Sequence, residues 1–169
     1  MRSAHAAETI KVGALYSQTG GLSIVEKMLA NGVLMAVAEI NAAGGKAIAL
    51  QADVTDLASV RAMIGKAEQA FGPIDVLVNN AGNAGATPDP DARKPFWETG
   101  PEVWNSFIGV NLYGVINCAS ACIPQMIERK GGRIVTIISD AGRAGEAGLE
   151  VYSGAKAGEI GRASCRERV

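Results

Sequence analysis

Three side chains in the last third of the sequence, Ser139, Tyr152 and Lys156, have the types and spacing for carbonyl chemistry. A serine hydroxyl can polarise an oxygen, a tyrosine can pass a proton, and an ammonium group stabilises a phenolate. A helix from Val151 onward would place Tyr152 and Lys156 on one face, roughly a turn apart. A bare Tyr-x-x-x-Lys pair also arises by chance on surface helices, so the elements around it must decide.

The elements that would position these side chains follow an α/β pattern. The apolar run 133–138 predicts a buried parallel strand that ends at Ser139. The carboxyl end of such a strand is where open α/β sheets bind their ligands. The other elements expected in this part of the chain are strands over 47–51 and 74–78 and helices over 57–71 and 101–129.

Three further short motifs accompany these elements. Asp53-Val54 follows the first predicted strand, Asn79-Asn80-Ala81-Gly82 follows the second, and Asn111 lies within the long helix. Together with the serine, tyrosine and lysine, they resemble the short-chain dehydrogenase/reductase family over about 45–158. The resemblance implies a Rossmann-like, doubly wound parallel sheet (three-layer α/β/α), here incomplete at both ends. It also implies an oxidoreductase that interconverts a secondary alcohol and a ketone with NAD or NADP.

The resemblance implies catalytic roles for four residues. Tyr152 would exchange a proton with the substrate oxygen, and Lys156 would hold the nicotinamide ribose and stabilise the tyrosine phenolate. Ser139 would position the substrate carbonyl. Asn111 would hold a water that relays protons past Lys156.

It implies cofactor contacts for others. Asp53 and Val54 would contact the adenine, and Asn80, Ala81 and Gly82 would pass close to the cofactor, to which Tyr152 and Lys156 also contribute. From the residues alone, Asp53 also fits a helix start and Asn79-Asn80 a turn at a strand end. The second strand, which would decide between NAD and NADP, is missing.

The first 45 residues depart from this family. Thr19-Gly20 begins a phrase similar to its glycine-rich loop, but Ile24 and Glu26 occupy the positions of the next glycines. Residues 4–45, with a strand expected over 10–16 and a helix over 24–42, instead resemble the N-terminus of a periplasmic branched-chain amino-acid or amide-binding protein. We therefore expect one truncated Rossmann-like domain over 1–169, in which 1–45 is an atypical βα unit that a gene fusion would explain.

The last eleven residues, 159–169, depart as well. Their sequence has no apolar stripe and matches the translation of a common sequencing-adapter oligonucleotide. We expect residues 46–158 to form the dehydrogenase core and 159–169 to be a non-native tail. The strands over 47–51 and 74–78 would be the third and fourth of a sheet with the order 3-2-1-4-5-6, so two strands should lie between them. Only the single strand expected over 10–16 is available for those two positions. We therefore expect the chain to be poorly folded or inactive.

Composition excludes several classes of function. A net charge of −1 gives no electrostatic argument for nucleic acid or an anionic membrane. No apolar run approaches ~18 residues, so no membrane span is expected. With His5 as the single histidine, neither histidine-based catalysis nor a metal site is expected.

The expected partner is a small-molecule alcohol or ketone, and a narrower likeness points to hydroxyacyl-thioesters or cyclic alcohols. The family resemblance further implies a cytoplasmic homodimer or homotetramer. Two other functions stay open: a periplasmic binding-protein fragment fused to a non-catalytic dehydrogenase remnant, and a non-catalytic α/β interaction module. Binding of a nicotinamide cofactor would separate the enzyme from both.

Overall fold

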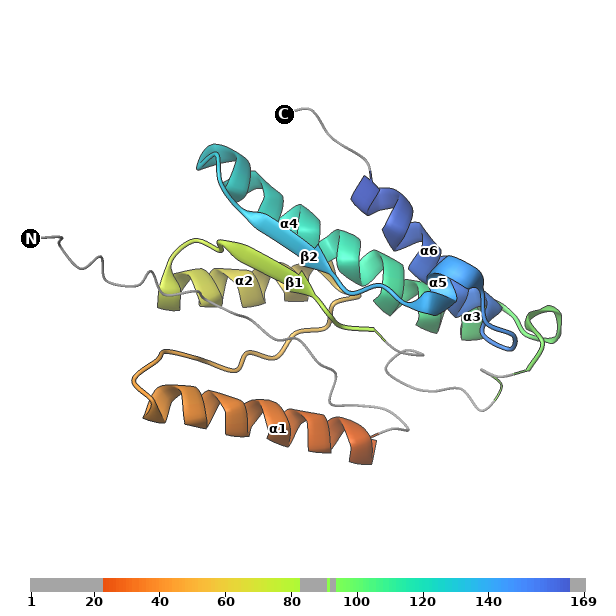
Figure 1. Cartoon of the computed structure of the whole chain (residues 1–169), viewed down its shortest axis with the longest axis horizontal. Coiled ribbons are helices and arrows are strands. Elements are labelled where there is room, and N and C mark those ends of the chain that lie inside the picture. The colour runs from red at the N-terminus through yellow and green to blue at the C-terminus, as the bar shows by residue number, and fades with distance from the viewer. Residues whose placement is uncertain (1–22, 83–90, 92–93, 165–169) are drawn as a thin grey trace, which may run out of the picture.

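The computed structural model describes residues 23–82, 91 and 94–164, which form an open α/β unit around a short parallel sheet (Figure 1). The strand expected over 10–16 lies outside the described residues. The main elements in chain order are α1 (Ser23–Ala42), α2 (Leu57–Phe71), β1 (Val76–Asn79), α3 (Pro101–Ile108), α4 (Gly114–Glu128), β2 (Arg133–Thr136), α5 (Asp140–Ala144) and α6 (Glu150–Ser164). A 3-10 turn, Phe96–Glu98, precedes α3, and a π-helical turn, Gly109–Tyr113, joins α3 to α4.

The sheet consists of β1 and β2, which run parallel with Val76 opposite Arg133 and Asn79 opposite Thr136. Backbone hydrogen bonds beyond the ladder, such as that from Ile137 N to Asn79 O (2.9 Å), extend the pairing at the carboxyl ends. The strands expected over 74–78 and 133–138 are therefore present, with slightly different bounds. Both polypeptide segments leave the sheet at the same edge, as a parallel pair requires.

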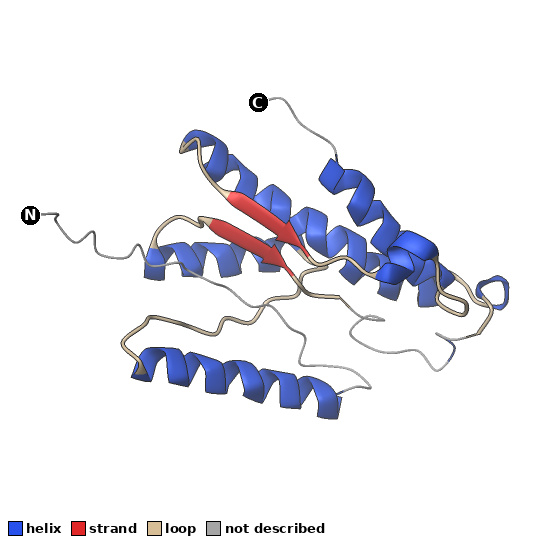
Figure 2. Cartoon of the chain, in the orientation of Figure 1, coloured by secondary structure: helices blue, strands red, loops and turns tan. Residues whose placement is uncertain are grey.

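Helices α2 and α4 pack on one another and cover one face of the sheet (Figures 1 and 2). Asp56 caps α2 by accepting hydrogen bonds from the backbone of Ala58 and Ser59. The apolar stripe of this helix then meets the small and thiol side chains of α4. The buried residues of this core are Val54, Val60, Ile64, Leu77, Cys118, Ala119, Cys122 and Met126.

The long helix expected over 101–129 is present but is not uniform. Its backbone changes from α-helical to π-helical over Gly109–Tyr113 and then returns to α-helical. The combined helix Pro101–Glu128 is long and apolar enough to cross a membrane by length and composition, with a mean hydropathy of 1.5 over its most apolar window. A core helix passes the same test, and the α4 part of this one packs against α2 and β1.

Residues 47–51 do not form the expected strand. They connect α1 to α2 without regular secondary structure, and no strand in the described part of the chain pairs with them. The physical reason is that a strand exists only as part of a sheet, and in the described part of the chain β1 has β2 as its one neighbour. Helix α1 has the expected bounds within one residue. It lies apart from the core (Figure 1). Its Leu34 and Met35 side chains are exposed.

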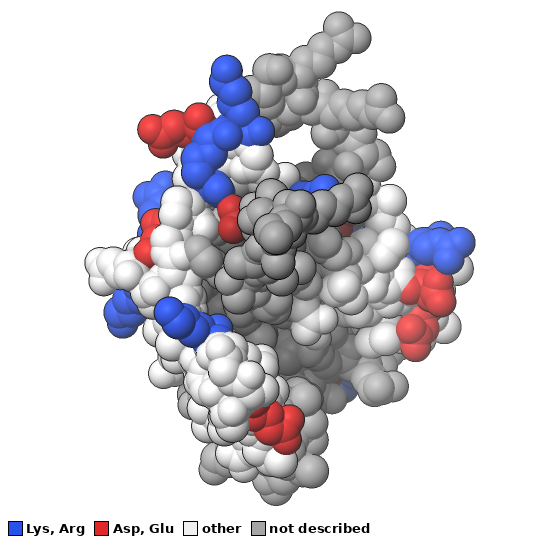
Figure 3. All heavy atoms as spheres, turned by 60° about the vertical axis from the view of Figure 1, so that its left-hand side comes forward, with Lys and Arg blue, Asp and Glu red and all other residues white. Residues whose placement is uncertain are grey.

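The other face of the sheet is open in the described part of the chain. Val135 and Ile137 are 46% and 45% exposed. The α/β class and parallel pairing agree with an incomplete Rossmann-like fold. On the face drawn in Figure 3, basic and acidic side chains of the described residues are interspersed.

Candidate functional site

Ser139 lies at the carboxyl end of β2 and is the N-cap of α5. Its Oγ accepts a hydrogen bond from Ala141 N at 3.2 Å, which satisfies one of the donors at the start of that helix. The hydroxyl hydrogen is not used in this bond. The serine therefore has a donor that could reach an oxygen outside the protein.

Tyr152 lies in the first turn of α6 and is half-buried. Its ring packs edge-on against Phe107 of α3, with centroids 6.2 Å apart and planes at 63°. Among the described residues, no hydrogen bond joins the Tyr152 hydroxyl to Ser139 or Lys156. The ring contact fixes the side chain while leaving its hydroxyl able to serve a substrate.

Lys156 follows one turn later on the same helix and is buried, with 4% of the residue exposed. Its Nζ donates to the carbonyl oxygen of Ile137 at 3.2 Å and to Glu159 Oε1 at 3.3 Å. The first bond ties α6 to the segment that leaves β2. An ammonium group has three donors, so one N–H remains beyond these two bonds.

Asn111 is fully buried within the π-helical turn. Its Nδ2 donates to Phe107 O at 2.9 Å. A π turn inserts one residue into the helix and is frequent at functional sites, because it re-aims a side chain without ending the helix. Here it presents Asn111 toward the segment after β1.

Gly82 is where the segments after the two strands meet the helices. A Cβ built at this glycine would lie 2.9 Å from Asn111 Oδ1 and 3.0 Å from Lys156 Nζ. The chain after β1, the π turn and α6 therefore converge on one point at the carboxyl edge of the sheet. The three residues come from separate segments, each of which the sequence marked as part of the site.

Asn79, Asn80 and Ala81, the other residues of the motif at the end of β1, differ in their burial and contacts. Asn79 is buried and its Nδ2 donates to Thr136 Oγ1 at 3.3 Å, which braces the two strand ends. Asn80 is exposed and Ala81 is half-buried. Asn79 lies within β1 rather than in a turn and braces the two strands, while Asn80 is available at the surface.

Asp53 is held by contacts within its own turn and Val54 by the core, and among the described residues no hydrogen bond joins either of them to Gly82, Asn111 or Lys156. Asp53 Oδ1 accepts from Thr55 N at 2.9 Å and Thr55 Oγ1 at 2.7 Å. Val54 belongs to the core, and its carbonyl oxygen accepts from Asn117 Nδ2 at 2.9 Å. Their proposed contact with adenine therefore stays a prediction.

Several site residues were not identified from the sequence. Phe107 had no signal beyond the apolar spacing of its helix. Gly142 lets α5 approach α6, because a Cβ there would lie 2.8 Å from Lys156 C and Cβ. Glu159 was assigned to the tail, yet α6 continues to Ser164 and the Glu159 side chain is fully buried against Lys156.

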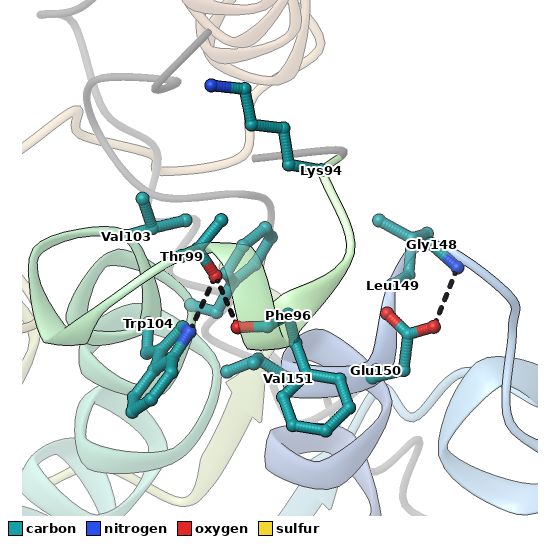
Figure 4. A pocket seen from close by; sticks show the side chains of 10 residues that line it. Lys94, Phe96, Thr99, Val103, Trp104, Gly148, Leu149, Glu150 and Val151 are labelled. Atoms are coloured by element: carbon teal, nitrogen blue, oxygen red, sulfur yellow. Dashed lines mark hydrogen bonds between the residues drawn. The ribbon is translucent and has the colours of Figure 1, made fainter. Parts of the chain in front are cut away.

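A pocket opens beside the tyrosine, between the turn before α3 and the start of α6 (Figure 4). The space inside it that a water-sized sphere can occupy is about 10 Å³, room for about one water molecule. Its lining is mainly aromatic and aliphatic, and Phe107 connects it to the Tyr152 ring. Thr99 Oγ1 holds one wall by accepting from Trp104 Nε1 at 2.8 Å and donating to Phe96 O at 2.9 Å. The lining residues are Lys94, Phe96, Thr99, Val103, Trp104, Phe107, Gly148, Leu149, Glu150 and Val151.

Comparison of the sequence with known protein families gives a match over most of the chain. The sequence pattern described as short chain dehydrogenase matches residues 14–166. That range extends beyond 45–158 at both ends. The fusion at residues 1–45 and the adapter-derived tail at 159–169 both stay predictions.

Two curated relatives and one solved structure illustrate the likeness. The chain is 39% identical over 125 residues to a 3-oxoacyl-(acyl-carrier-protein) reductase of Staphylococcus aureus (strain Mu50), covering 74% of this chain and 48% of the relative. A Synechocystis reductase of the same name is 44% identical with the same coverage. A variant of actinorhodin polyketide ketoreductase, crystallised with NADPH, superposes with a TM-score of 0.68 at 31% identity, covering 78% of this chain and 49% of that one. The chain thus spans about half the length of these relatives.

Proposed function

Because the chain belongs to the short-chain dehydrogenase family, whose members use NAD or NADP, we propose that it carries the catalytic half of an oxidoreductase that interconverts a secondary alcohol and a ketone. The convergence of Gly82, Asn111 and Lys156 at the carboxyl edge of the sheet supports this most directly. Open α/β sheets bind their ligands at this edge. Residues 46–158 would form the core of the catalytic unit.

The described residues fit the nicotinamide end of such a cofactor. At Gly82 the absence of a Cβ lets the Lys156 ammonium and the Asn111 amide lie close against the backbone after β1, which fixes the position of the lysine. Lys156 would hold the nicotinamide ribose through its remaining N–H. When bound, the dinucleotide would supply or accept a hydride. Asp53, Val54, Asn80 and Ala81 are proposed as the further contacts.

Tyr152 would deliver a proton to the substrate oxygen in reduction and remove it in oxidation. Ser139 would donate to the same oxygen, because its Oγ already accepts from Ala141 and its hydrogen remains available. The Lys156 ammonium would stabilise the phenolate, and Asn111 would hold the water that returns protons to the lysine. All four lie in elements that meet around the carboxyl end of β2.

The apolar residues around the pocket of Figure 4 would face the carbon chain of the substrate, and the pocket, at about 10 Å³, would have to widen to admit it. Apolar walls suit a hydrocarbon, and the pocket adjoins the ring that packs on Tyr152. The relatives are named for 3-oxoacyl and polyketide substrates. We therefore propose a hydroxyacyl-thioester as the substrate class, in preference to a cyclic alcohol.

The proposal further includes a homodimer or homotetramer that acts on small molecules in the cytoplasm, where a nicotinamide pool is present. The near-neutral net charge of −1 gives no support for binding to nucleic acid or an anionic membrane.

Fluorescence titration with NADH and NADPH tests the cofactor assignment, and oxidation of a 3-hydroxyacyl thioester tests the reaction. Tyr152→Phe should abolish turnover while leaving cofactor affinity within about twofold, because it removes one hydroxyl and keeps the ring on Phe107. Failure of the parent chain to bind either nucleotide at millimolar concentration would contradict the proposal.

A further inference from the structure

Glu159 and Lys156 form an ion pair unlike the other ion pairs in the described part of the chain. The partners of the other pairs are between 33% and 91% exposed, whereas Lys156 and Glu159 side chains are 6% and 0% exposed. Burying a carboxylate beside an ammonium removes both from water, and the pair then becomes strongly coupled. This coupling acts at the lysine on which the proposed function depends.

We propose that in the chain as it stands Glu159, which was assigned to the tail from the sequence, is a positioning residue that holds the Lys156 ammonium and weakens its attraction for an anionic dinucleotide. The inference rests on the proposed function. Its geometric basis is that Nζ already donates to Ile137 O at 3.2 Å and to Glu159 Oε1 at 3.3 Å. A ribose hydroxyl must share the ammonium with this carboxylate.

The sign of the effect follows from electrostatics. An isolated ammonium attracts an anion, but an ammonium with a carboxylate 3.3 Å away acts as a dipole with no net charge. Both groups are excluded from water, so the cancellation is only weakly screened by salt. Removing the negative charge should therefore strengthen binding of a pyrophosphate-containing ligand, whereas the loss of a merely structural contact would leave binding unchanged or weaker.

The helix explains why the pair forms. Lys156 and Glu159 are three residues apart on α6, so their side chains leave the same face. That face is directed toward the segment after β2 and toward the π turn, as the lysine contacts with Ile137 and Gly82 require. The Lys156 ammonium thus contacts buried Glu159 on its own helix and also lies beside Gly82.

The test compares NADPH dissociation constants by fluorescence titration for the parent chain and Glu159→Gln. We expect NADPH to bind about tenfold more tightly to Glu159→Gln, because the side-chain shape is kept and the opposing charge is lost. Glu128→Gln is the matched control, since it makes the same change of charge at an exposed position of α4. It should leave the dissociation constant within about twofold.

A double-mutant comparison tests whether the effect passes through the lysine. In the Lys156→Met background, Glu159→Gln should change NADPH affinity by less than about twofold. An equal gain in both backgrounds would instead mean direct repulsion between the carboxylate and the nucleotide, and would overturn the inference. In the absence of ligand, the change in thermal midpoint caused by Glu159→Gln should differ between the parent and the Lys156→Met background, because the two side chains interact.

Glu159→Asp covers the case in which the glutamine variant does not fold. It keeps the charge but withdraws it by one methylene group, so its affinity should lie between those of the parent and Glu159→Gln. A parent that binds NADPH with folded variants that bind no more tightly would overturn this inference and leave the proposed function standing. Absence of binding to the parent and to every variant would overturn both.

Discussion

At the residue scale, the close approach of Asn111 and Lys156 to Gly82 can be tested by adding a single methyl group. In Gly82→Ala the new Cβ would lie 2.9 Å from Asn111 Oδ1 and 3.0 Å from Lys156 Nζ. The Asn111 amide is buried and bonded to Phe107 O, so the more flexible lysine must move. We expect NADPH affinity to fall about tenfold, because displacing a positioned group by a fraction of an ångström weakens its contacts.

The thermal midpoint of Gly82→Ala should change little, since the contacted atoms are side-chain ends. Gly154→Ala is its control on α6, where a Cβ meets nothing within 4 Å. The interpretation of the site fails if Gly82→Ala binds NADPH as well as Gly154→Ala does.

The two cysteines of α4 give a second prediction at this scale. Burial raises the pKa of Cys118 from 9.0 to about 11, and burial with the nearby Cys118 and Glu68 raises that of Cys122 to about 11. At pH 8 their thiolate fractions are about 100-fold below those of thiols at the ordinary value. Iodoacetamide should therefore modify them slowly until the chain is unfolded, as measured by peptide mass spectrometry.

The raised pKa values of these two thiols also predict how the stability of the chain depends on pH. A raised pKa means that the folded chain keeps protons that the unfolded chain releases. The contribution of these thiols to stability is therefore complete below about pH 9 and declines as the pH rises toward 11. Fast alkylation of both cysteines in the folded chain at pH 8 would contradict the burial.

At the residue scale, three residues that the sequence singled out lie together in the structure, and their catalytic and cofactor-binding roles stay predictions. Lys156, Asn111 and Gly82 were expected from their places after strands or within helices, and the structure brings them together. Glu159 was missed because apolar periodicity identifies buried hydrophobic residues, whereas this carboxylate is buried through its pairing with a lysine. Phe107 was missed because its spacing marks a core residue equally well.

At the element scale, the π turn depends on two glycines. The backbone N–H of Gly114 donates to Gly109 O, which closes the wide turn. A Cβ at Gly114 would lie 2.8 Å from Val54 Cγ2 in the core. Gly114→Ala gains about 1 kcal/mol of helix propensity but costs about 1–3 kcal/mol in overpacking. We expect a net fall in the free energy of unfolding, measured by urea titration.

Gly65→Ala on α2 is the matched control. A Cβ at this helical glycine meets nothing within 4 Å, so the substitution should stabilise the chain by about 0.5–1 kcal/mol. Gly114→Ala should therefore lower the free energy of unfolding, and Gly65→Ala should raise it. A stabilising Gly114→Ala would show that the helix and Val54 can separate without cost.

Sequence reasoning succeeded for elements whose periodicity is local and failed where long-range pairing decides. Helix α2 and the strands β1 and β2 lie close to their expected positions. The π turn could not be foreseen, because inserting one residue hardly changes an apolar pattern that continues on both sides. Residues 47–51 have a strand-like composition, yet a ladder partner is absent from the described part of the chain.

At the scale of the whole molecule, the sheet has two strands and an uncovered face within the described residues. Val135 and Ile137 are exposed there, beside the outer edge of β2. Exposed apolar surface next to an open strand edge favours pairing with another chain.

We therefore expect the chain to self-associate as its concentration rises, and Val135→Lys to reduce this association. Val135 is 46% exposed, so the lysine can reach solvent without disturbing the core, while its charge opposes stacking of two sheets. Sedimentation velocity over a wide concentration range measures the effect. Leu34→Lys on α1, at a residue that is 50% exposed, makes the same change of charge away from the sheet. If Leu34→Lys suppresses association and Val135→Lys does not, the chains meet through α1 rather than through the open sheet.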